Sequence, residues 1–123
     1  DFNLSWLEQQ LTGLSLTAED IQATLVMFTA QTMADAIRHL DTDINEVYVC
    51  GGGAFNGQLM AKLQISLGNI RVQSTTALGL EPNWVEACAF AWLAKQRIDM
   101  KSGNLAAVTG ASRRTVLGAV YLP

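Results

Sequence analysis

Apolar residues recur every three to four positions along the first third of the chain, a pattern typical of helices with one buried side. Residues 3–10 predict a short helix that ends before Gly13. Residues 17–20 (Thr-Ala-Glu-Asp) resemble a capping box with Asp in place of Glu, and they predict the start of a long helix that reaches about Leu40. Its apolar positions are Ile21, Leu25, Phe28, Met33, Ala36, Ile37 and Leu40. We expect this stripe to face the core.

A strand, a glycine turn, a helix and a second strand follow in that order. Residues 46–50 (Glu-Val-Tyr-Val-Cys) are rich in β-branched and aromatic side chains and predict a short strand. Three glycines at 51–53 separate it from a helix at about 56–67. Gly68-Asn69 ends that helix, and residues 70–74 predict the second strand. The sequence therefore predicts an α/β fold built on a parallel βαβ unit with flanking helices.

A third helix is predicted at about residues 83–97, after a loop at 75–82. It is apolar on nearly every side, which is typical of a helix that is buried on most sides. We therefore expect Trp84, Phe90 and Trp92 to be core residues rather than a stacking platform for a ligand.

The composition limits the classes of function. Half of the 123 residues are hydrophobic and 15% are charged, below the roughly 25% usual for soluble domains. This fits either a well-buried α/β domain or a surface that another domain or a second subunit covers. A net charge of −3 disfavours a nucleic-acid partner. No apolar run approaches the roughly 18 residues of a membrane span, so no membrane role is expected.

The cysteines and the single histidine carry no metal or disulfide pattern. Cys50 and Cys88 form no Cys-x-x-Cys motif, and each lies in an apolar stretch, where a free thiol behaves as a small hydrophobe. This usage fits a reducing cytoplasm. His39 falls in the last turn of the long helix and is expected to interact with the helix dipole rather than to act as a catalytic base. No metal ligands are predicted.

The glycine turn is the strongest candidate for chemistry. Gly51, Gly52 and Gly53 follow the carboxyl end of a strand, where ligands bind in open α/β sheets, and glycines let a ligand approach the backbone. Asn56 is placed to cap the next helix and to offer its amide to a ligand. No Gly-Lys-Ser/Thr follows, so this is not a P-loop, and Asn56 stands where a dinucleotide fingerprint needs its third glycine. A plain tight turn is the alternative, but three glycines exceed what a turn needs.

Four segments together resemble one family. They are Val-Cys-Gly-Gly-Gly-Ala-Phe-Asn at 49–56, Thr-Thr-Ala-Leu-Gly-Leu-Glu-Pro-Asn-Trp-Val-Glu-Ala-Cys-Ala-Phe-Ala-Trp-Leu-Ala at 75–94, Asn-Leu-Ala-Ala-Val-Thr-Gly-Ala at 104–111 and Leu-Gly-Ala at 117–119. In this order and spacing they are similar to the C-terminal part of anhydro-N-acetylmuramic acid kinases, which are sugar kinases of the actin-like ATPase superfamily. The resemblance covers nearly the whole chain.

The resemblance implies a fold and an activity. Such kinases use ATP, with Mg²⁺, and water to open the 1,6-anhydro ring and phosphorylate O6, which gives N-acetylmuramic acid 6-phosphate in cytoplasmic peptidoglycan recycling. Two RNase H-like lobes close over the nucleotide. Residues 1–123 would be the C-terminal nucleotide-binding lobe, in which Gly51, Gly52, Gly53 and Ala54 match the adenosine-binding turn and Asn56 lies nearby.

The same resemblance places the catalytic machinery elsewhere. The phosphate loop and the general-base aspartate belong to the N-terminal lobe, which is the expected partner of this one. The aspartates of this chain fall on predicted helix faces or polar turns, namely Asp20, Asp35, Asp41, Asp43 and Asp99. No catalytic residue is therefore assigned, and residues 1–123 alone are predicted to be inactive. A homodimer remains an open alternative for the assembly, and a non-catalytic nucleotide-binding module of the actin or Hsp70 type remains one for the function.

Glu86, Thr75 and Thr76 are the candidates for the sugar side of the cleft. Glu86 is an acid in the first turn of an apolar helix, where it interacts with the helix dipole or faces the cleft between the lobes. The Glu-Ala-x-Ala-Phe-Ala pattern of the family favours the cleft. Thr75 and Thr76 follow the carboxyl end of the second strand, where they line the same cleft or simply cap the turn.

Overall fold

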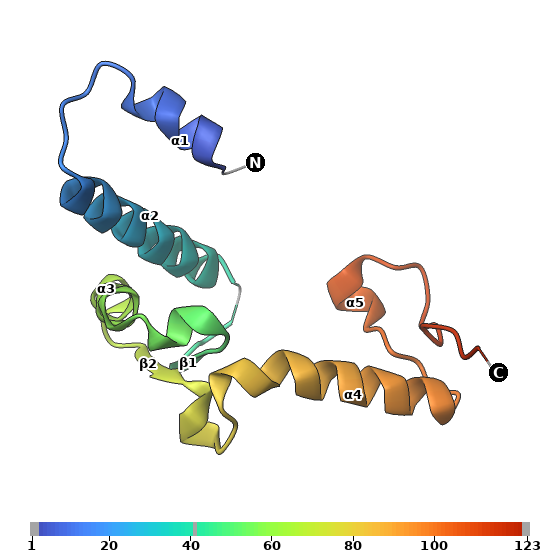
Figure 1. The fold of residues 1–123 in the computed structure, drawn as a ribbon. Helices are drawn as coiled ribbons and strands as arrows, with labels where there is room; N and C mark the ends of the chain where they lie inside the picture. Colours follow the sequence, from blue (N-terminus) through green and yellow to red (C-terminus); the bar gives the residue numbers. More distant parts are fainter. Residues whose placement is uncertain (1–2, 41, 122–123) are drawn as a thin grey trace.

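A computed structural model describes residues 3–40 and 42–121, and its order of elements confirms the predicted mixed α/β fold (Figure 1). The helices are α1 (Leu4–Leu11), α2 (Ala18–Arg38), α3 (Gly57–Leu67), α4 (Val85–Ile98) and α5 (Ala106–Thr109), and the strands are β1 (Glu46–Val49) and β2 (Arg71–Ser74). Three short 3₁₀ turns complete the fold: η1 (Gly52–Phe55), η2 (Thr75–Leu78) and η3 (Pro82–Trp84).

Local side chains fix where the first two helices begin. The Asn3 side chain accepts a hydrogen bond from the Trp6 amide at 2.9 Å and caps α1. The Thr17 hydroxyl accepts from the Asp20 amide at 3.1 Å and donates to the Asp20 carboxylate at 2.9 Å, which confirms the predicted capping box. Helix α2 ends at Arg38, slightly earlier than predicted.

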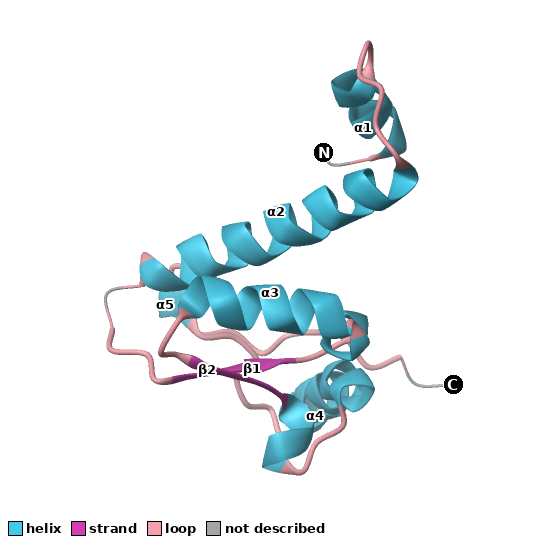
Figure 2. Cartoon of the chain, turned by 90° about the vertical axis from the view of Figure 1, so that its left-hand side faces the viewer, coloured by secondary structure: helices cyan, strands magenta, loops and turns pink. Residues whose placement is uncertain are grey.

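The two strands are parallel, as the βαβ pattern predicts. Glu46 pairs with Arg71 and Val49 with Ser74. Each strand is one residue shorter than its predicted range. Figure 2 shows α3 directly over the strands and α2 over α3, with α4 on the other side of the sheet. The carboxyl ends of both strands therefore meet at one edge.

The core is small and lies between α2, α3 and the strands. Its buried residues are Ala30, Ala34, Val49, Leu63 and Leu67. Ala30 and Ala34 are one turn apart on α2, and both are fully buried, so their small side chains let α2 and α3 approach closely. This packing places β1 under the helix pair and sets the position of the glycine turn that follows it.

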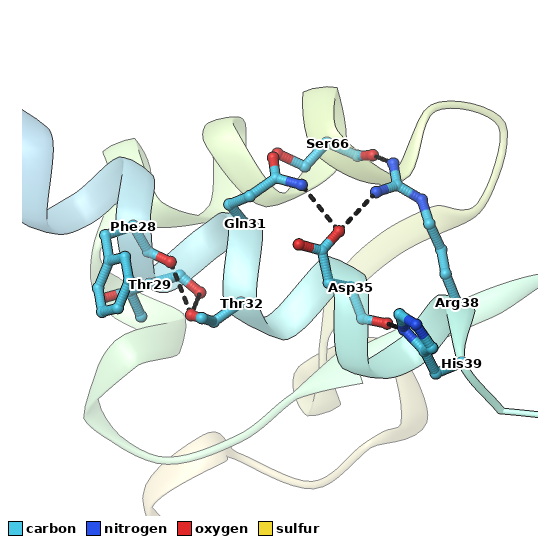
Figure 3. A network of polar contacts seen from close by, with 8 residues as sticks. All are labelled: Phe28, Thr29, Gln31, Thr32, Asp35, Arg38, His39 and Ser66. Carbon is cyan, nitrogen blue, oxygen red and sulfur yellow. Dashed lines mark hydrogen bonds and ion pairs between the residues drawn. The ribbon is translucent and has the colours of Figure 1, made fainter.

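Polar contacts tie the end of α2 to the end of α3 (Figure 3). The Asp35 carboxylate accepts hydrogen bonds from Gln31 at 2.8 Å and from Arg38 at 3.1 Å, and Arg38 also donates to the Ser66 carbonyl in the last turn of α3. The His39 ring nitrogen Nδ1 lies 2.6 Å from the Asp35 carbonyl oxygen. His39 thus contacts the carboxyl end of its own helix, in agreement with the structural role predicted for it.

Helix α4 departs from its prediction, because none of its residues is buried. Trp84 and Phe90 are each 63% exposed and Trp92 is 50% exposed, so they are not core residues of the described chain. The reason is the architecture: α4 projects away from the sheet (Figure 1), and its main neighbours are η3 and the segment around Gly103. Cys88 on α4 and Cys50 at the end of β1 are both exposed free thiols, although each lies in an apolar stretch of the sequence.

Candidate functional site

The carboxyl edge of the strand pair gathers the predicted site residues. Gly51, Gly52 and Gly53 follow β1, and Thr75 and Thr76 follow β2. Since the strands are parallel, both turns lie at the same edge of the sheet. In α/β proteins this edge is where ligands bind.

Gly51 joins this edge to the start of α4. Its backbone has φ 72° and ψ −172°, a conformation that is essentially restricted to glycine. Its amide donates a hydrogen bond to the Pro82 carbonyl at 2.9 Å, and η1 packs against η3. This bond brings the first turn of α4, which carries Glu86, toward the glycine turn. The sequence gives no sign of this long-range contact.

Packing within the described chain does not require a glycine at position 52. A Cβ placed on it meets no atom within 4 Å, and its φ is not positive. A Cβ on Gly53 would lie 3.4 Å from the Leu59 side chain, which is an ordinary contact. The space beside Gly52 is therefore open, as it must be for a ligand that approaches the backbone of the turn. Ala54 packs partly against the core.

Asn56 caps α3, as predicted. Its side-chain oxygen accepts hydrogen bonds from the amides of Gln58 and Leu59, both at 3.1 Å. The residue is exposed, and it lines a shallow depression with Gln22, Gln58 and Lys62. The carboxamide oxygen is thus committed to the helix, and the amide nitrogen is the group left to meet a ligand.

Replacing Asn56 by alanine should destabilise the protein by about 1 kcal/mol, because two amides of α3 lose their acceptor. Thermal unfolding measures this loss. Asn56→Asp is the matched control, since it keeps the accepting oxygen at the cap and replaces the amide nitrogen by a second, negatively charged oxygen. The aspartate variant should unfold like the wild type, and equal losses in both variants would contradict the capping role.

Thr75 and Thr76 differ in their surroundings. The Thr75 hydroxyl oxygen is buried and has no hydrogen-bond partner among the described residues, whereas Thr76 is exposed. The backbone carbonyls of both residues close the turn, since Thr75 accepts from the Leu80 amide at 3.2 Å and Thr76 from the Gly79 amide at 2.9 Å. These hydrogen bonds show that Thr75 and Thr76 form a turn. Their contact with a sugar stays a prediction.

Glu86 is exposed in the first turn of α4. Within residues 3–40 and 42–121 its carboxylate makes no hydrogen bond or ion pair that would hold it to the fold. Burial therefore does not penalise its charge here, contrary to the cost that an apolar helix suggested. The carboxylate lies in the first turn of α4, where the helix dipole favours a negative charge.

The described residues show neither a cluster of metal ligands nor a membrane-spanning helix. Across them no group of three or more His, Cys, Asp or Glu is arranged to hold a metal ion. Asp20, Asp43 and Asp99 lie on exposed positions and Asp35 is half-exposed, while Asp41 falls outside the described residues. In the same part of the chain, no helix has the length and apolar character needed to cross a membrane.

The fold and the carboxyl edge of the strand pair define a mixed α/β protein with a glycine-rich turn between a parallel strand and a helix. The family model for anhydro-N-acetylmuramic acid kinase matches residues 1–123, and the chain belongs to that family. It is 48% identical over 120 residues to the anhydro-N-acetylmuramic acid kinase of Nitrosomonas europaea, with 98% of this chain and 33% of the relative covered. These findings confirm the resemblance seen in the sequence.

Two further relatives carry the same name. The protein of Coxiella burnetii is 45% identical over 120 residues, which cover 98% of this chain and 32% of the relative. The protein of Thiobacillus denitrificans is 48% identical over 122 residues, which cover 98% of this chain and 33% of the relative. The chain thus spans about a third of the length of the curated relatives that it matches.

Proposed function

We propose that residues 1–123 form the C-terminal, ATP-binding lobe of a two-lobe sugar kinase with an RNase H-like fold. The observation that carries the proposal is the glycine turn: Gly51 holds a glycine-only conformation and is bonded to Pro82, while the space beside Gly52 is open. In this proposal Gly51, Gly52, Gly53 and Ala54 bind the adenosine part of ATP. The amide nitrogen of Asn56 provides a polar contact nearby.

The open side of the turn fits a nucleotide. A flat base or a ribose packs closely on backbone that carries no Cβ, and the carboxyl edge of the strands provides the binding face. ATP supplies the phosphoryl group, and Mg²⁺ neutralises the charge of its phosphates. As the family resemblance implies, the phosphate loop and the general-base aspartate are assigned to the N-terminal lobe.

The proposed reaction is that of the family. Water adds to C1 of 1,6-anhydro-N-acetylmuramic acid as the bond from C1 to the bridging O6 breaks, and O6 takes the γ-phosphoryl group of ATP. The products are N-acetylmuramic acid 6-phosphate and ADP, and the setting is peptidoglycan recycling in the cytoplasm. Glu86, Thr75 and Thr76 are proposed to contact the sugar, since all three lie toward the edge that carries the glycine turn.

The N-terminal lobe is also the proposed cover for α4. The exposed Trp84, Phe90 and Trp92 make an apolar helix surface that is costly to leave in water. The low charged fraction of the chain supports the same conclusion. Closure of the second lobe over this surface would bury it and would bring the Glu86 carboxylate into a cleft between the lobes.

The full-length protein should phosphorylate the anhydro sugar in a coupled assay for ADP formation, whereas residues 1–123 alone should show no turnover. The reason is that the phosphate loop and the general-base aspartate are assigned to the N-terminal lobe. Turnover by the isolated segment would refute the division of roles. ATP binding by the full-length protein without turnover of any anhydro sugar would instead favour the non-catalytic nucleotide-binding module.

A further inference from the structure

Residues 104–115 form a closed loop, because the side chain of Asn104 joins its two ends. The Asn104 side-chain oxygen accepts a hydrogen bond from the Thr115 amide at 2.7 Å, and the side-chain nitrogen donates to the Arg113 carbonyl at 3.0 Å. The Gly103 amide adds a bond to the Thr115 carbonyl at 3.1 Å. Surface loops of this length with ends held together are frequently functional. We call this segment the Asn104 loop.

The Asn104 loop is anchored to α4 on the same face of that helix as Glu86. A Cβ placed on Gly103, at the start of the loop, would lie 3.1 Å from the Leu93 side chain, so the loop packs tightly on α4 there. Leu93 and Glu86 are seven residues apart, which is about two turns, or about 10 Å, along one face of a helix. Phe90 lies between them on this face and is 63% exposed. The loop and Glu86 therefore border one open stretch of α4.

The Asn104 loop carries two adjacent arginines, Arg113 and Arg114. Both side chains are exposed, and neither makes a hydrogen bond or an ion pair with another described residue. The backbone carbonyl of Arg113 holds the loop closed, so its guanidinium group is not needed for that purpose. Four other basic residues form ion pairs with carboxylates of the chain, namely Arg38, Arg71, Lys95 and Lys101. The two arginines thus present positive charge on a loop of fixed ends.

We propose that Arg113 and Arg114 bind the carboxylate of the sugar substrate. The proposal rests on the kinase function given above, in which the substrate is an N-acetylmuramic acid derivative whose lactyl side chain ends in a carboxylate. Guanidinium groups pair with carboxylates through two parallel hydrogen bonds. A sugar held by Glu86 extends its lactyl group along the same face of α4 toward the loop. The arginine pair makes the site selective for an acidic amino sugar over neutral ones, and Asn104 is a positioning residue for that pair.

Steady-state kinetics of the full-length protein tests the arginine pair. The double variant Arg113→Gln, Arg114→Gln should raise the KM for the anhydro sugar about 10- to 100-fold, the range for a hydrogen bond to a charged group. The KM for ATP and the thermal unfolding midpoint should not change. Lys101→Gln is the matched control, since Lys101 is also exposed but pairs with Asp99, and it should keep wild-type kinetics. An unchanged KM for the sugar in the double variant would overturn the proposal. A raised KM for ATP alone would assign the pair to phosphate and would also overturn it.

The methyl ester of the anhydro sugar separates the carboxylate contact from the kinase function. The wild type should lose on the neutral ester the same factor in KM that the double variant loses on the acid, and the double variant should treat acid and ester alike. Asn104→Ala should lower kcat/KM for the acid but not for the ester, a difference that a general loss of stability does not produce. Equal wild-type kinetics on acid and ester would refute the contact and leave the kinase function intact. No turnover of either sugar by the wild type would refute the kinase function itself.

Discussion

Gly52→Ala should weaken ATP binding by the full-length protein about tenfold or more and leave its thermal unfolding unchanged. The structure separates these two effects because the alanine Cβ meets no protein atom within 4 Å, and the φ of Gly52 suits any residue. The new methyl group therefore costs the fold nothing. In the proposed site it stands where the nucleotide packs on the backbone, and a loss of about 1.4 kcal/mol in binding is a tenfold change in affinity.

Two neighbouring glycines serve as matched controls for this prediction. Gly51→Ala places a side chain at φ 72° and should destabilise the protein by about 1–3 kcal/mol, with a loss of ATP affinity as the turn distorts. Gly57→Ala, in the first turn of α3, also meets open space and should change neither property. Titration calorimetry and thermal unfolding measure both quantities for all three variants. Unchanged ATP affinity in Gly52→Ala would show that the glycines form only a turn.

The order of the elements could be predicted because local sequence determines it. Thr17 and Asn56 cap helices through hydrogen bonds to amides two or three residues away, so the signal for each helix start lies within a few positions. The β-branched and aromatic side chains of residues 46–50 likewise predict β1 without knowledge of its partner. The spacing between β1 and β2 then leaves room for one helix, and this is why the parallel pairing was predictable.

The burial of α4 could not be predicted, because burial depends on what lies next to a helix. Its sequence predicts apolar surroundings on most sides, yet Phe90 and Trp92 are exposed within the described chain. An apolar face shows that a helix needs a cover and does not show which element provides it. The exposed thiols of Cys50 and Cys88 have the same explanation. The apolar sequence of α4 and its exposure are consistent with each other when the remaining part of the full-length protein covers this helix.

The residues proposed for the site could be named from the sequence, but the hydrogen bonds that join their segments could not. Three consecutive glycines mark the turn, yet the bond from Gly51 to Pro82 joins positions about thirty residues apart and leaves no local pattern. The Gln64 contacts with Ile70 and Val72 are equally hidden, since a glutamine on a helix is usually solvated. Such contacts decide which segments the fold brings together. They have to be taken from the structure.

Glu86→Gln should lower turnover of the anhydro sugar by about 10- to 100-fold in the full-length protein, because a hydrogen bond between a charged group and the sugar contributes about 1.5–3 kcal/mol. The thermal unfolding midpoint should change little, because the exposed carboxylate makes no contact with the described chain and a helix-dipole interaction contributes only about 0.3–1 kcal/mol. ATP affinity should also be unchanged, since the substitution removes charge and keeps the size of the side chain. Steady-state kinetics with both substrates separates these effects.

Glu81→Gln is the matched control for this experiment. Glu81 is also exposed and lies five residues before Glu86, and its backbone carbonyl accepts a hydrogen bond from the Trp84 amide at 2.9 Å. It should therefore keep nearly full activity, although the net charge changes by the same amount. If Glu86→Gln also kept its activity, or lost stability and turnover together, Glu86 would be a helix-end residue and the sugar contact would have to come from Thr75, Thr76 or the N-terminal lobe.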